Sequence, residues 1–71
     1  MTERAKRIYR AWEDKWVESN KFPNHEELSL AAAIREIVIE VVLSYMQYAE
    51  WEIVNKIMED INELADNVEA L

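Results

Sequence analysis

The most apolar part of the chain runs from residue 34 to residue 48, and its pattern predicts a helix that is buried on almost every side. At about 100° per residue, the polar side chains of this segment fall on one narrow stripe. The stripe consists of Glu36, Glu40, Ser44 and Gln47. Because the remaining circumference is apolar, such a helix has to be surrounded by protein or by lipid.

Within this segment, residues 37–42 also have a high propensity for β-structure. A single strand has no partner in a chain whose flanking segments are helical in pattern, so we predict a helix over about residues 25–47. The β-branched residues lower its intrinsic helix propensity, so tertiary burial has to stabilise it.

The first segment has the pattern of an amphipathic helix over about residues 2–20. Its apolar side chains fall within about 100° of one another at the helical period. They are Ala5, Ile8, Tyr9, Trp12 and Trp16. We expect Thr2 to cap the start of this helix and Asn20 to end it as a C′ residue in the left-handed conformation.

Pro23 predicts a turn over residues 21–24, because proline pushes the preceding residue out of the helical region. Asn24, with Glu27 three residues later, has the spacing of a capping box. The next helix is therefore predicted to begin at residue 25.

A third amphipathic segment covers about residues 50–70. Its apolar side chains recur in steps of three and four, close to a coiled-coil seam. They are Val54, Ile57, Ile61, Leu64, Val68 and Leu71. The centre of this stripe lies about 120° round from that of the preceding helix. Either the chain breaks between Ser44 and Trp51, giving a three-helix bundle, or one long or kinked helix packs in a dimer. We favour the second alternative, because no loop-forming sequence separates the two segments.

These patterns predict a single all-α domain, residues 1–71, with two or three helices and a core completed by dimerisation. The first helix has one apolar face and cannot cover all of the central helix. We expect the uncovered apolar residues to form the interface between two copies. The predicted interface residues are Ile39, Leu43, Met46, Val42 and Trp51.

Composition narrows the possible environment and partners. The 71 residues include no cysteine, which excludes disulfides and thiolate metal sites. No apolar run approaches the ~20 residues of a membrane span, and residues 1–10 lack the apolar core of a signal peptide. We therefore expect a soluble, cytoplasmic protein that is not bound to a membrane. The net charge of −7 also argues against nucleic acid as a partner.

The candidate chemistry is limited to one histidine and several carboxylates. His25 has no second ligand or nucleophile at a useful spacing, so we predict no catalytic, cofactor-binding or metal-binding residue and no cofactor. Residues 63–66, with the sequence Glu-Leu-Ala-Asp, resemble the Glu-x-x-Asp half of the motif of the MazG-like all-α NTP pyrophosphohydrolases. That resemblance implies a Mg²⁺-dependent enzyme. The Glu-Glu-x-x-Glu half is not matched, since Glu26 and Glu27 are followed by Leu28-Ser29-Leu30.

We therefore predict a small, acidic, non-catalytic protein–protein interaction module that self-associates as a homodimer and could also bind another protein. One alternative is an acidic inhibitor that occupies the basic site of a nucleic-acid-binding protein. The other is the pyrophosphohydrolase. The absence of glycine and cysteine would also suit an engineered or redesigned helical scaffold.

Overall fold

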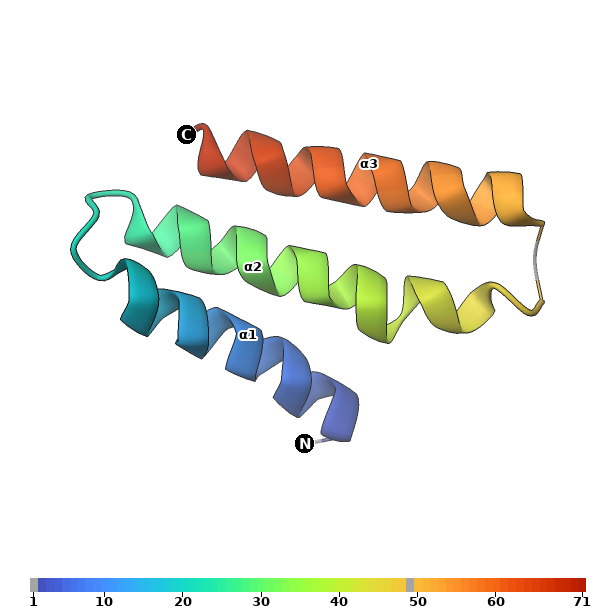
Figure 1. The fold of residues 1–71 in the computed structure, drawn as a ribbon, viewed down its shortest axis with the longest axis horizontal. Helices are drawn as coiled ribbons and strands as arrows, with labels where there is room; N and C mark the ends of the chain where they lie inside the picture. The colour runs from blue at the N-terminus through green and yellow to red at the C-terminus, as the bar shows by residue number, and fades with distance from the viewer. Residues whose placement is uncertain (1, 49) are drawn as a thin grey trace.

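The computed structural model describes residues 2–48 and 50–71 and contains three α-helices and one 3₁₀-helix (Figure 1). They are α1 (Glu3–Ser19), α2 (His25–Glu40), the 3₁₀-helix η1 (Val42–Tyr45) and α3 (Trp51–Glu69). No strand occurs within the two described ranges, and none of their helices is both long and apolar enough to cross a bilayer. The prediction of an all-α fold with two or three helices is confirmed.

Helix α1 begins where the sequence predicts, but it ends in a different conformation. Thr2 Oγ1 accepts a hydrogen bond from the backbone N–H of Ala5 at 3.1 Å, which is the predicted N-cap. Asn20, at the other end, has φ −60° and ψ −16°. The prediction of a left-handed residue there is wrong. The turn instead closes through the N–H of Phe22, which donates to the carbonyl of Ser19 at 2.9 Å.

Helix α2 begins at His25 without the predicted capping hydrogen bond. Asn24 occupies the N-cap position, but its side chain makes no capping bond within the described chain. A capping side chain is normally carried by an extended residue, whereas Asn24 has φ −101° and ψ 29°. The first turn is favoured instead by Glu26 and Glu27, whose charges lie near the positive end of the helix dipole.

The chain breaks after Glu40, so the long or kinked helix favoured by the sequence is wrong. Val41 and η1 tighten the end of α2, and the Ser44 hydroxyl donates to the carbonyl of Val41. Valines have a low helix propensity, and serine competes for backbone groups, so this segment leaves the helix without glycine or proline. Glu50 is extended, with φ −64° and ψ 139°, and α3 then runs back along α2.

The three helices form a single layer with α2 in the middle, as Figure 1 shows. Helix α1 packs on one side of α2 and α3 on the other, and within the described residues the backbones of α1 and α3 do not approach each other. The Cα atoms span 41 × 28 × 14 Å, so the layer is about one helix thick. The arrangement therefore differs from the closed bundle considered above, since both faces of the layer lack a covering element.

The buried core is small and lies mainly between α2 and α3. Val38, Val42 and Val54 form its centre, with Met58 and Ile61 packed against it. Ala31 and Ala65, on the same sides of α2 and α3 as these valines, have no exposed surface. Near the turn, Ser19 and Ser29 are buried between α1 and α2. Their hydroxyls donate to carbonyls one turn earlier in their own helices. Small side chains at these positions let the helices approach closely.

Candidate interaction surface

Helix α2 has two buried sides and two uncovered sides, because its neighbours lie on opposite sides of it. Ser29 is buried in α2 about 180° round from Val38, which packs against α3. Leu30 and Ile37 lie between these buried sides and are exposed. Ile39 is also exposed, but it lies about 160° round from Ile37 at the helical period. Ile37 and Ile39 therefore belong to opposite faces of the layer.

An apolar groove of about 470 Å³ lies between α1 and α2. Its lining residues are Ala5, Ile8, Tyr9, Trp12 and Ala33. The rings of Tyr9 and Trp12 stack with centroids 6.1 Å apart, and those of Trp12 and Trp16 are 4.9 Å apart. His25 ends this aromatic row with its ring edge-on to Trp16 at 4.3 Å.

A second apolar groove, of about 370 Å³, lies between α2 and α3. Its lining residues are Val41, Val42, Tyr45, Ile53, Val54 and Ile57. Ala33 in the first groove and Val41 in the second lie about 40° on either side of Ile37. Both grooves therefore open on the face of the layer that carries Leu30 and Ile37, which form a ridge between them.

We refer to this side of the layer as the apolar face. Its exposed side chains come from all three α-helices and η1: Tyr9, Leu30, Ile37, Tyr45, Ile53, Ile57 and Leu64. Leu64 belongs to it because it lies about 20° round from Ile57 on α3. Each side chain is about half exposed, so together they expose on the order of 500–900 Å². The largest apolar patch of a typical monomer is roughly 300–600 Å², and a standard interface takes about 800 Å² from each partner.

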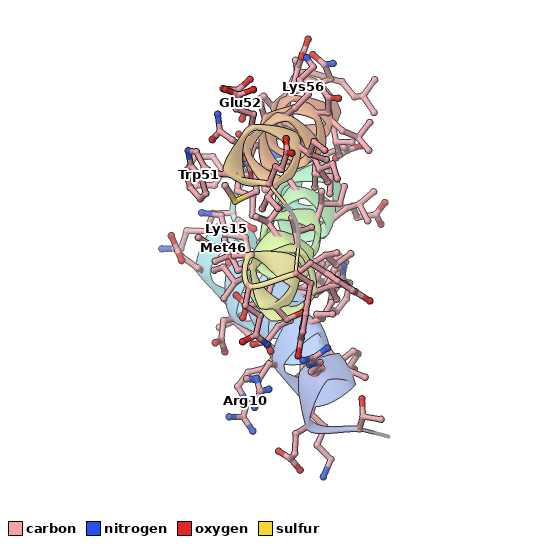
Figure 2. All side chains as sticks on the ribbon, turned by 90° about the vertical axis from the view of Figure 1, so that its right-hand side faces the viewer. Arg10, Lys15, Met46, Trp51, Glu52 and Lys56 are labelled. Atoms are coloured by element: carbon pink, nitrogen blue, oxygen red, sulfur yellow. The ribbon has the colours of Figure 1, made fainter. Side chains whose placement is uncertain are left out.

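Of the interface residues predicted from the sequence, Val42 lines the second groove of the apolar face, whereas Ile39, Met46 and Trp51 lie elsewhere. Met46 and Trp51 are exposed on the same side of the layer as Lys15 (Figure 2). Trp51 is about 120° or more round α3 from Ile53, Ile57 and Leu64. Together with Ile39, these residues belong to the face opposite the apolar face. Leu43 is exposed within η1, whereas Val42 is only 8% exposed because it packs in the chain's own core.

The exposed side chains of the apolar face are not among the interface residues predicted from the sequence. The sequence predicts one apolar seam on the last helix that includes Val54, Ile57 and Leu64. In the structure, Val54 is buried against α2, whereas Ile57 and Leu64 lie beside it and are exposed. The width of the apolar arc on α2 and α3 does indicate that part of it stays exposed, since a single neighbouring helix cannot cover so wide an arc.

Interhelical ion pairs join α2 to both of its neighbours. Arg7 Nε donates to Glu40 Oε1 at 2.6 Å; Arg7 lies about 160° round α1 from Tyr9, whereas Glu40 lies about 60° round α2 from Ile37, towards α1. Arg35 donates to Asp66 at 2.7 Å and also to Glu69, and it lies about 160° round α2 from Ile37. These bonds hold the pKa of Glu40 and that of Glu69 below their ordinary values. Helices α1 and α3 are thus each joined to α2 by an arginine–carboxylate interaction.

The carboxylates considered for metal binding are spread over the layer and are partly engaged by arginines. Glu40 is bound by Arg7 and Asp66 by Arg35. Glu36 lies beside Glu40, and partial burial, together with Glu40, raises the pKa of Glu36. Within residues 2–48 and 50–71, no three histidine or carboxylate side chains come together as a set that could hold a metal ion.

Comparisons with models of known protein families, with curated proteins and with solved structures give no match for this chain.

Proposed function

We propose that the protein is a non-catalytic protein–protein interaction module that acts by self-association into a homodimer. The apolar face is the observation that carries this proposal. Stable domains bury the apolar sides of their helices between two layers, and this chain supplies one layer. A second copy would supply the other.

The small core of a single chain supports a partner that is always present. Its buried apolar residues are valines and alanines, of which Val54 is the largest that is almost fully buried. A chain of about 70 residues rarely obtains more than ~3–5 kcal/mol of stability from its core alone. Covering the apolar face would add to this stability. A second copy of the chain is present wherever the chain itself is produced.

The dependence of the melting temperature on protein concentration tests this function. Unfolding of a dimer releases two chains, so dilution favours the unfolded state by mass action. We expect the melting temperature to rise by roughly 5–10 °C over a hundredfold increase in concentration. A melting temperature that stays constant over this range would contradict self-association.

The outer side of α3 supports a second candidate, the acidic inhibitor of a nucleic-acid-binding protein. Glu52, Glu59 and Glu63 are exposed there and could bind a basic surface. This function predicts a complex with a basic protein that weakens steeply with salt. Self-association through the apolar face predicts a dimer that is retained at high salt, because burial of apolar surface is its main source of stability.

A further inference from the structure

We infer that two copies pack apolar face against apolar face around a two-fold axis parallel to α2, so that α1 of each copy lies over α3 of the other. This arrangement rests on the proposed self-association and specifies its geometry. It makes α1 and α3, whose backbones do not approach each other within the described part of one chain, direct neighbours across the interface.

Symmetry limits the possible face-to-face dimers. Homodimers are usually two-fold symmetric, with the same surface contributed by both copies. For two stacked layers, the axis lies between them and runs either along α2 or across it. An axis along α2 exchanges the two edges, so α1 lies over the partner's α3. An axis across α2 keeps the edges, so α3 lies over the partner's α3.

The charges of the two edges favour the axis along α2. Helix α3 carries six carboxylates against one lysine, Lys56, so stacking α3 on α3 brings like charges together. The first half of α1 is basic instead, with four cations against Glu3: Arg4, Lys6, Arg7 and Arg10. Placing this half over α3 of the partner replaces the repulsion with attraction.

Positions along the layer agree with this pairing. In Figure 1 the first half of α1 lies across α2 from the central part of α3. Rotation about an axis parallel to α2 does not change position along α2, so these two segments meet in the dimer. Lys6 lies about 60° round α1 from Tyr9, and Asp60 lies about 20° round α3 from Ile53 on the side away from Ile57, so both border the apolar side chains of the face. Each already pairs with an exposed neighbour, Lys6 with Glu3 and Asp60 with Lys56, and pairs of this kind are weak.

The shape of the face also suits a second copy. The ridge of Leu30 and Ile37 stands between two apolar grooves, and every copy presents both the ridge and the grooves. A small sideways shift of the axis from the centre of the layer places the ridge of each copy over a groove of the other. Packing of ridges into grooves is the usual way in which helices meet.

A charge exchange tests the arrangement by equilibrium sedimentation. We expect Lys6→Glu to raise the dimer dissociation constant about threefold to tenfold, since rim charges have modest effects. The double variant Lys6→Glu/Asp60→Lys should restore the original constant. Within the described chain Lys6 pairs with Glu3 and Asp60 with Lys56, and the backbones of α1 and α3 do not approach each other, so such a rescue indicates a contact between copies. A double variant that binds no better than Lys6→Glu would overturn the inference.

Cross-linking provides a second test that leaves these charges in place. The chain has no cysteine, so single cysteines can be introduced without background. Glu13 and Asn67 are exposed near the rim, about 40° round from Tyr9 and about 60° round from Leu64 respectively. An equimolar mixture of Glu13→Cys and Asn67→Cys, treated with a short bis-maleimide, should give at least severalfold more cross-linked dimer than either variant alone. The control mixture is Lys15→Cys with Asn62→Cys, which lie towards the opposite face and should give only background.

The outcomes separate this inference from the proposed function. Equal cross-linking in the mixture and in the single variants, from a protein with the mass of a dimer, would overturn the arrangement and leave self-association standing. A wild-type protein with the mass of one chain would overturn both.

Discussion

Ile37 and Ile39 are separated by one residue in α2 and lie on opposite faces of the helical layer. Ile37 belongs to the apolar face between two grooves, and Ile39 is 57% exposed on the face that also carries Met46 and Trp51. The two isoleucines have the same size and β-branching. They therefore form a matched pair for deciding which face is used.

Ile37→Glu should dissociate the dimer, and Ile39→Glu should not. A buried, unpaired carboxylate in an apolar interface carries a large desolvation cost, so we expect the dissociation constant of Ile37→Glu to rise by at least about a hundredfold. Sedimentation measures both variants, and circular dichroism checks that each remains helical. If Ile39→Glu dissociates the dimer and Ile37→Glu does not, the face predicted from the sequence is the one that self-associates.

Val54→Ala should lower the free energy of unfolding by about 2–3 kcal/mol, since it removes two buried methyl groups and leaves a cavity. Val54 is 2% exposed and packs against Val38 and Val42. Chemical denaturation at a fixed protein concentration measures the change. The control is Val17→Ala, at a site that is 70% exposed, which should stay within about 0.5 kcal/mol of wild type. Equal effects of the two substitutions would place the core elsewhere.

Thr2→Ala should cost about 1 kcal/mol, because it removes the side-chain bond to the N–H of Ala5. Asn24→Ala should change stability by less than about 0.5 kcal/mol, because the side chain of Asn24 makes no capping bond within the described chain. The same denaturation measurement compares them. A larger loss for Asn24→Ala than for Thr2→Ala would show that the capping box predicted from the sequence does form.

Glu36→Gln should stabilise the protein at pH 7 and have no effect in acid. The pKa of Glu36 is raised above its ordinary 4.5 by burial and by Glu40, so the ionised side chain destabilises the folded state at neutral pH. We expect the melting temperature to rise by roughly 1–3 °C at pH 7. The gain should vanish below about pH 4, where Glu36 is protonated in both the folded and the unfolded chain.

Glu69→Gln is the matched control, for which the expected change in stability at pH 7 has the opposite sign. Arg35 lowers the pKa of Glu69, so its charge stabilises the folded state at pH values above the ordinary pKa. The variant should be less stable than wild type at pH 7. Its deficit should disappear as the pH falls through the lowered pKa of Glu69. If both glutamine variants shift stability in the same direction at pH 7, the assigned charge environments are wrong.

The first and last helices were the elements predicted most accurately from the sequence. Helices were predicted over about residues 2–20 and 50–70, and α1 and α3 span Glu3–Ser19 and Trp51–Glu69. Amphipathic periodicity is a local property, so it needs no knowledge of the partner. The Thr2 cap and the turn at Pro23 were readable for the same reason.

The break after Glu40 was not readable, because no glycine or proline marks it. Weak helix formers such as Val41, Val42 and Ser44 do not by themselves end a helix, and the gain in stability that favours the break comes from packing Val54 onto Val38 and Val42. This gain depends on residues more than ten positions apart. Which apolar residues stay exposed depends on where α3 packs against α2. The apolar face therefore could not be predicted from the pattern of each helix taken separately.

The molar mass of the wild-type protein in solution, measured by light scattering, tests self-association most directly. At micromolar concentration we predict twice the mass of one chain, with the apolar face of each copy covered by the other. A compact, folded protein with the mass of a single chain at this concentration would contradict the proposal.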